Sequence, residues 1–215
     1  MSTTEFASAS LTAGQLNAMV KKLGGPEMAL RFLRDELTVS APLHPWTDQD
    51  NVIRFSVTSD GTSGEEWISR LEKKGFRISN YAKSILRSKD FKPTSGVTTD
   101  IAVLKGTLFT DNDRITKNIR AYAATLSFDG RKLSTPNAEI ACLIREKFSD
   151  EDIEKMGLTW IIAMHEPIKD SGGGPRLLSA RRFDGGRWLF AYWDCPDFWW
   201  SGGSGFAFAV SQVGA

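Results

Sequence analysis

A thiol and an imidazole are the side chains in this sequence with the clearest capacity for chemistry. Cys195 and His165 could form a nucleophile–base pair if folding brings them together, with Asp194 or Asp197 orienting the imidazole. A thiol-dependent enzyme that uses Cys195 and His165 is therefore one alternative for the function. The second cysteine, Cys142, lies in the apolar stripe of a predicted helix and is interpreted as a small core residue.

No other group of residues fits a catalytic or metal-binding motif. The stretch His165–Lys169 (HEPIK) lacks the second histidine of HExxH, and its proline prevents a continuing helix. The stretch Ser171–Pro175 (SGGGP) lacks the Gly-Lys-Ser/Thr ending of a phosphate loop. Asp170, Asp184 and Asp194 leave calcium binding open as an alternative. We predict no catalytic residue, no metal and no cofactor.

The composition is that of a globular chain without a strong charge bias. The chain has 215 residues, of which 41% are hydrophobic, and a formal net charge of +1. This balance disfavours strong nucleic-acid binding, which needs clustered Lys and Arg. No apolar run is long enough to span a membrane, and residues 1–10 lack the basic and apolar parts of a secretory signal. We expect a cytoplasmic protein, with export to the surface by another route left open.

Residues 1–95 are predicted to form a small α/β segment that begins with a helix pair at 12–37. Thr12 and Gln15 have the spacing of a capping box at the start of the first helix. The elements expected after the pair are a strand and two helices, at 51–59, 64–75 and 79–88. The Pro- and Gly-containing stretch 92–96 is interpreted as the linker to a second domain.

The helix pair at 12–37 has two interpretations. Its short connection and four basic residues leave open a DNA-binding regulator as a second alternative for the function. Those basic residues are Lys21, Lys22, Arg31 and Arg34. Asp35 and Glu36 offset part of this charge, so a docking or oligomerisation role is favoured.

Residues 97–215 are predicted to form an α+β domain with the order strand, helices and then several strands. The first strand is expected over 98–109. Three helices are expected at 111–126, 135–148 and 149–157. Three strands are expected at 158–168, 187–193 and 205–213. Ser149, followed by acidic residues, has the pattern of a helix N-terminus.

Aromatic residues are concentrated in the tail, where nine of the 23 lie between residues 188 and 208. One set of tail residues is predicted to face a core: Trp188, Leu189, Ala191, Phe206, Phe208 and Val210. A second set falls at alternate strand positions or in loops, where a fold by itself favours polar residues. We predict that this second set forms an exposed ligand-binding surface: Phe183, Phe190, Tyr192, Trp193, Cys195, Phe198, Trp199, Ser201 and Ser204. The alternative for Phe190 and Tyr192 is a strand that is covered on both faces.

The tail resembles the variable region of proteins that are diversified by diversity-generating retroelements. The resemblance rests on DGGRWL (Asp184–Leu189), DCPD (Asp194–Asp197) and GFAFAV (Gly205–Val210). It implies a C-type-lectin-like domain over 97–215, with the broad fold of formylglycine-generating enzymes and a variable region at about 177–205. Residues 1–95 resemble only small proteins of uncultured bacteria, which imply no activity for them.

The resemblance implies a hypervariable binding protein without catalysis. In such systems adenines are replaced at random in the copied region, so the products of asparagine codons include Phe, Tyr, Ser, Cys, Gly and Arg but never Trp. Most of the second set belongs to these products, whereas Trp193 and Trp199 would need a different starting codon. Ser179 and Arg181 also belong to them, and Gly202 and Gly203 could arise from Arg and Asp codons, so the resemblance adds these four residues to the predicted ligand-binding surface. The implied partner is an unidentified protein or other macromolecule, and the oligomeric state stays open.

Overall fold

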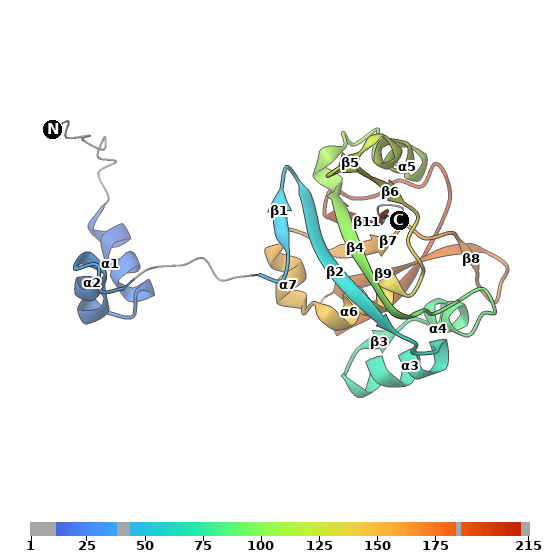
Figure 1. Cartoon of the computed structure of the whole chain (residues 1–215), viewed down its shortest axis with the longest axis horizontal. Helices are drawn as coiled ribbons and strands as arrows, with labels where there is room; N and C mark the ends of the chain where they lie inside the picture. Colours follow the sequence, from blue (N-terminus) through green and yellow to red (C-terminus); the bar gives the residue numbers. More distant parts are fainter. Residues whose placement is uncertain (1–11, 38–43, 184–185, 212–215) are drawn as a thin grey trace. The chain divides into compact units, whose positions relative to one another are not determined.

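The computed structural model describes residues 12–37, 44–183 and 186–211 (Figure 1). The chain divides into two compact units, Met1–His44 and Pro45–Ala215. The larger unit combines helices with one large mixed sheet, which agrees with the predicted α+β class. Among the described residues, the helices are all too short or too polar to cross a bilayer.

The smaller unit contains the predicted helix pair, α1 (Ala13–Lys22) and α2 (Pro26–Leu33). The predicted capping box is confirmed. The Thr12 amide donates to Oε1 of Gln15 at 2.9 Å, and the Gln15 amide donates to the Thr12 hydroxyl. Most of the pair's apolar side chains are exposed, including Leu16, Met19, Leu30, Phe32 and Leu33.

The larger unit is built from alternating strands and short helices. Its helices are α3 (Gly64–Lys73), α4 (Asn80–Leu86), the 3-10 turn η1 (Gly106–Leu108), α5 (Thr116–Thr125), α6 (Ile140–Lys147) and α7 (Asp150–Lys155). Its first six strands are β1 (Thr47–Gln49), β2 (Val52–Asp60), β3 (Arg77–Ile78), β4 (Ser95–Lys105), β5 (Ser127–Phe128) and β6 (Arg131–Ser134). Its remaining strands are β7 (Trp160–Ala163), β8 (Ile168–Lys169), β9 (Pro175–Phe183), β10 (Gly186–Trp193) and β11 (Ser204–Val210).

The main sheet has the strand order β1-β2-β4-β11-β7-β9-β10-β3. Strand β2 pairs antiparallel with β4 along nearly its whole length, and β4 pairs antiparallel with the terminal strand β11. The predicted domain boundary at residues 95–97 is therefore wrong, because strands on both sides of it belong to one sheet. The stretch 92–96 leads into β4, and the Thr94 amide and hydroxyl donate to the buried carboxylate of Glu139.

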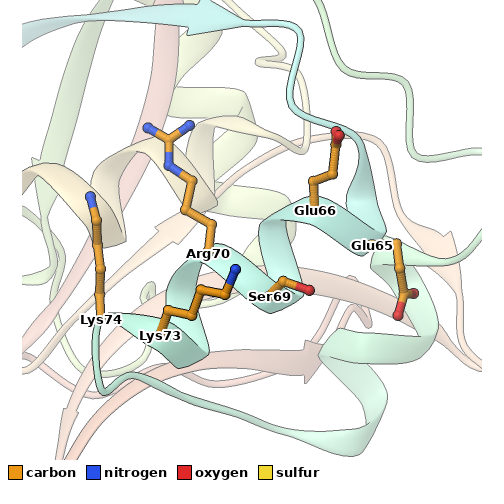
Figure 2. Close-up of a pocket in the computed structure, with 6 residues that line it drawn as sticks. All are labelled: Glu65, Glu66, Ser69, Arg70, Lys73 and Lys74. Carbon is orange, nitrogen blue, oxygen red and sulfur yellow. The ribbon is translucent and has the colours of Figure 1, made fainter.

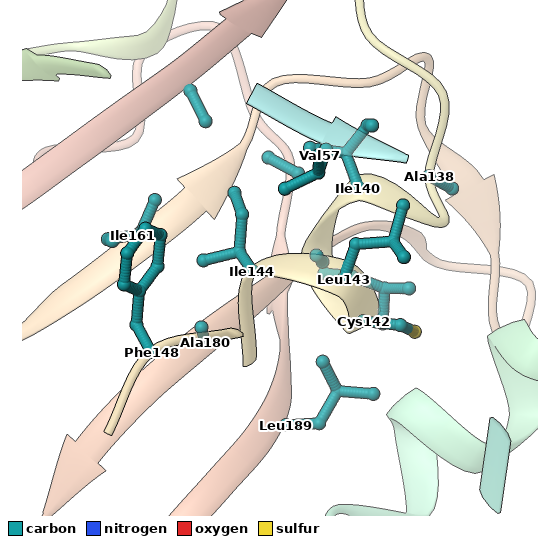
Figure 3. Close-up of a cluster of buried hydrophobic side chains, with 14 of the residues drawn as sticks. Val57, Ala138, Ile140, Cys142, Leu143, Ile144, Phe148, Ile161, Ala180 and Leu189 are labelled. Carbon is teal, nitrogen blue, oxygen red and sulfur yellow. The ribbon is translucent and has the colours of Figure 1, made fainter. Parts of the chain in front are cut away.

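Two hydrophobic cores lie on opposite faces of this sheet, because alternate residues of a strand point to opposite sides. In β7, Ile161 belongs to the first core and Ile162 to the second. The first core receives side chains from α3, α4, α6 and α7, and Figure 3 shows the contribution of α6 around Ile144. The second core receives side chains from α5 and β6 and the indole of Trp200.

The N-terminus of α3 has a capping box, and a substitution there tests how much the box stabilises the protein. The Ser63 amide donates to Oε2 of Glu66 at 2.8 Å, and the Glu66 amide donates back to the Ser63 hydroxyl. We expect Ser63→Ala to lower the free energy of unfolding by about 1 kcal/mol, because one first-turn amide loses its acceptor. Ser69→Ala, on the exposed side of the same helix (Figure 2), should leave stability nearly unchanged in urea unfolding. Equal losses in both variants would contradict a capping role.

Candidate ligand-binding surface

Aromatic side chains gather over strands β7, β9 and β10, on the sheet face of the second core. Arg181 of β9 pairs in register with Trp160 of β7 on one side and Trp188 of β10 on the other. Phe190 and Tyr192 follow at alternate positions of β10 and so share this face, whereas the residues between them are buried in the first core. We call Trp160, Arg181, Trp188, Phe190 and Tyr192 the ring face. The prediction that Trp188 faces a core is wrong, because it is half-buried here.

The rings of this face form a continuous series of contacts. Ring centroids lie 6.4 Å apart between Trp188 and Phe190, and 5.0 Å apart between Phe190 and Tyr192. Tyr192 also meets the edge of Trp160 at 4.4 Å. Because edge-to-face and tilted contacts between aromatic rings are favourable, each ring restrains its neighbours.

Arg181 lies at the centre of the ring face. Its guanidinium carbon is 4.6 to 5.8 Å from the ring centroids of four aromatic residues, Trp160, Phe183, Phe190 and Tyr192. Its Nη1 donates to the Tyr192 hydroxyl at 2.6 Å. Burial raises the pKa of Tyr192 against the opposing effect of this guanidinium, so the phenol stays protonated at neutral pH.

The predicted aromatic residues differ in exposure. Phe183 and Trp199 are 56% and 55% exposed. Phe190, Tyr192 and Phe198 are half-buried, and the last two pack partly against the second core. These three rings therefore have one side supported by the fold and another side that reaches solvent. The alternative of a strand covered on both faces does not apply to β10 at Phe190.

Trp193 does not belong with the other rings. It is 45% exposed, but it lies on the opposite side of β10, where the Arg176 guanidinium is 5.0 Å from its ring centroid. The same guanidinium lies 4.1 Å from the ring of Tyr81 on α4. The sequence-based grouping of Trp193 with Phe190 and Tyr192 is wrong, because odd and even positions of a strand face opposite ways.

Two of the predicted surface serines are buried. Ser179 and Ser204 have no exposed area, so the prediction that they contact a ligand directly is wrong. Ser179 lies opposite Phe190 in the register, under the ring face, and Ser204 lies within hydrogen-bond distance of the Ser201 hydroxyl at 3.3 Å. Ser204 is the first residue of β11 and belongs to the scaffold.

The two glycines in this loop have different surroundings. A Cβ atom built at Gly203 would lie 2.9 Å from Oγ1 of Thr159, which is too close without a local shift. At Gly202 the nearest atoms belong to the Arg114 guanidinium and lie 3.8 Å away, an ordinary contact. Only Gly202 of this pair therefore has room for a side chain.

The loop between β10 and β11 is held by its backbone. The Thr116 and Lys117 amides, which begin α5, donate to the carbonyls of Phe198 and Pro196 at 3.2 and 2.9 Å. Further on, the Trp200 amide donates to the Arg114 carbonyl at 2.9 Å. Hydrogen bonds between main-chain groups do not depend on the side chains of the loop. These main-chain bonds fix its path, and among the exposed rings Trp199 adds one hydrogen bond, from Nε1 to the Asp111 carbonyl.

Comparison with known proteins gives no relative for this arrangement. No protein-family model, curated protein or solved structure matches the chain. The functional argument therefore rests on the geometry of the described residues: a ring-lined face around one arginine, beside a loop that the main chain holds in place.

Cys195 and His165, the pair of the enzyme alternative, do not contact each other as a nucleophile and a base would. His165 is 1% exposed, and its two ring nitrogens contact the Glu166 carbonyl at 2.6 Å and the Leu178 amide at 2.9 Å. The imidazole therefore donates from Nδ1 and accepts at Nε2. No hydrogen bond joins Cys195 to His165 among the described residues, and burial raises the pKa of the Cys142 thiol.

The carboxylate Asp170 and the charged residues along α3 are both engaged in contacts within the protein. In the described residues no group of three or more His, Cys, Asp or Glu side chains is arranged to hold a metal ion. Asp170 instead accepts from the Gly172 and Gly174 amides and from Arg176. A shallow hollow along α3 is lined by charged residues (Figure 2), but Arg70 and Lys74 are both paired with Glu146 of α6.

Sequence reasoning missed three residues of this region. Trp160 falls at an alternate position of a strand, which was the available signal for a residue on the ring face. Arg77 lies 5.6 Å from the Trp188 ring centroid only because β3 pairs with β10, a long-range contact without a local pattern. Trp200, the neighbour of Trp199, is 1% exposed and belongs to the second core.

Proposed function

We propose that this chain is a hypervariable ligand-binding protein with a C-type-lectin-like scaffold and a tail diversified by a retroelement. The ring face and the neighbouring Phe183, Phe198 and Trp199 are its binding surface. Large rings supply contact area at a small cost in side-chain entropy, and such residues often contribute most of the binding free energy.

The observation that carries the proposal is the separation between scaffold and surface within β10. Leu189 and Ala191 are fully or almost fully buried, whereas Phe190 between them reaches solvent. The following loop is fixed by main-chain hydrogen bonds to α5 and to Arg114. Side chains on the outer surface can therefore change while the inner residues and the backbone maintain the fold.

The arrangement of the larger unit supports the lectin-like part of the proposal. From β4 onward the order is a strand, helix α5, the short strands β5 and β6, helices α6 and α7, and then strands. Apart from the β5–β6 pair, this is the order that the resemblance implies. The strands β4 and β11 of this region pair antiparallel, so β11 is built into the sheet between β4 and β7. A terminal strand fixed in this way gives the preceding variable loop a rigid support.

We expect a library randomised at the outward positions Phe183, Phe190 and Trp199 to remain largely folded. Single changes at exposed positions usually alter stability by about 0.5 kcal/mol or less, and the half-buried Phe190 should contribute somewhat more. The control library is randomised at the inward positions Leu189 and Ala191, where polar residues should abolish folding in most clones. Protease resistance of the displayed protein, read by sequencing, measures both libraries.

Equal losses of folded clones in the two libraries would contradict the proposed division between scaffold and surface. Diversification itself is tested at the gene. We expect a reverse-transcriptase gene nearby and a second copy of the tail's coding sequence that differs only at adenines. A locus with neither feature would overturn the retroelement part of the proposal and leave a fixed binding surface.

A further inference from the structure

The ring face contains a guanidinium without a counter-ion in the described part of the chain. Arg181 makes no salt bridge there, and its Nε atom is buried without a hydrogen-bond partner. The other arginines of β9 are paired, Arg182 with Glu154 at 2.9 Å and Arg176 with Asp170 at 2.7 Å. The Nε of Arg182 is also buried without a hydrogen-bond partner, so Arg181 differs from its neighbours on the strand in having no carboxylate partner among the described residues.

The rings hold this guanidinium in one place. Four aromatic residues surround it, and Tyr192 accepts one of its hydrogen bonds, so little side-chain freedom is left to lose when a ligand binds. The rings also exclude water from its sides. A charge pair formed next to them is stronger than one formed in open solvent, because the local dielectric constant is lower.

A second arginine adds positive charge at the same face. The Arg77 guanidinium lies 5.6 Å from the Trp188 ring centroid, and it too has no ion pair in the described residues. Trp188 therefore lies between Arg77 and Arg181, and no carboxylate of the described residues is bound to either. This local charge contrasts with the net charge of the whole chain, which is +1.

We propose that Arg181 receives a carboxylate from an acidic side chain of a protein partner, with apolar partner residues packing on the surrounding rings. The inference rests on the proposed binding function and names the chemistry of its partner. A guanidinium binds a carboxylate through two parallel hydrogen bonds, which supplies direction as well as affinity. Among the described residues, only two unpaired arginines lie on this face, whereas strong nucleic-acid binding needs many phosphate contacts.

The test selects dodecamer peptides from a random phage library on the immobilised full-length protein. Peptides recovered on the natural chain should carry Asp or Glu beside apolar residues. A synthetic peptide with one such Glu should bind Arg181→Met at least about tenfold more weakly. Replacing that Glu by Gln should cause a similar loss on the natural chain and little further loss on the variant. A purely structural role for Arg181 would weaken both peptides equally, which would overturn the inference.

Controls separate this inference from the proposed function. Thermal unfolding shows whether Arg181→Met folds. If it does not, the peptides are tested on Arg181→Lys, which keeps the positive charge but lacks the paired donors of the guanidinium. Peptides that depend on Phe190 but show no Glu–Arg181 coupling would overturn the carboxylate inference alone. Recovery of no peptide that depends on this face would overturn both. Binding of a dT15 oligonucleotide that depends on Arg181 and falls steeply with salt would also overturn the carboxylate inference, because the partner would then be a nucleic acid.

Discussion

Replacing Trp200 by alanine is expected to lower the free energy of unfolding by about 3–5 kcal/mol, the usual loss for a buried tryptophan. The indole is 1% exposed, and its ring lies 4.6 Å from Phe198 and 5.8 Å from Phe206. Its Nε1 donates to the buried hydroxyl of Thr116 at 2.9 Å. The change therefore leaves a cavity between the sheet and α5 and removes a buried hydrogen bond.

The adjacent Trp199 is the matched control for this experiment. It is 55% exposed, and its main defined contact is a 2.8 Å hydrogen bond from Nε1 to the Asp111 carbonyl. Trp199→Ala should lower stability by about 1 kcal/mol, the net value of one such bond. Urea unfolding of both variants measures the difference. Similar losses in the two would show that Trp199 is also part of the core, and the proposed binding surface would then lose its most exposed ring in the loop.

The sequence predicted the inward side of the tail better than the outward side. Leu189, Ala191 and Phe206 are buried as expected, because regular alternation in a strand has a direct structural meaning. Ser179 was misplaced because the resemblance counted it among the variable positions, while the rings above it and its central strand bury it. Trp193 was misplaced because aromatic character says nothing about which face of a strand a residue occupies.

The domain boundary failed for a different physical reason. Pro93 and Gly96 do mark a turn, and the Gly61 amide donates to the Thr94 carbonyl at 2.9 Å beside it. A turn between a helix and a strand has the same local composition as a linker between domains. The pairing of β2 with β4 distinguishes the two cases, and this pairing joins residues 35 or more positions apart.

Local helix signals were the most reliable part of the sequence. The capping residues Thr12 and Ser149 both bind the amides that their spacing predicted. Strand β9 was not predicted as an element, although it lies at the centre of the ring face. Its sequence, from Pro175 to Phe183, combines three arginines with two leucines and has no clean alternation. Pairing on both edges, with β7 and β10, makes it a strand.

The pH dependence of stability provides the second large expected effect. Burial lowers the pKa of His165 from 6.5 to about 4, and the nearby Arg120 guanidinium acts in the same direction. The folded state therefore holds a neutral imidazole that the unfolded chain protonates below about pH 6.5. The contribution of His165 to the free energy of unfolding is complete above about pH 6.5 and is lost as the pH falls towards 4. The shift of about 2.5 pH units corresponds to about 3 kcal/mol.

Urea unfolding between pH 7.5 and 4 measures this loss. His165→Gln should be less stable at pH 7.5, since the imidazole bonds to Leu178 and Glu166 are disturbed, but its stability should change much less across the window. Burial raises the pKa of Asp194, which opposes the effect, so Asp194→Asn in the same background should steepen the slope. Carboxylates with a lowered pKa, such as Asp60 at about 2, affect stability mainly below this window. An unchanged slope in His165→Gln would mean that the imidazole takes up a proton as readily in the folded protein as in the unfolded chain and so reaches water. The enzyme alternative would then regain a base that can titrate.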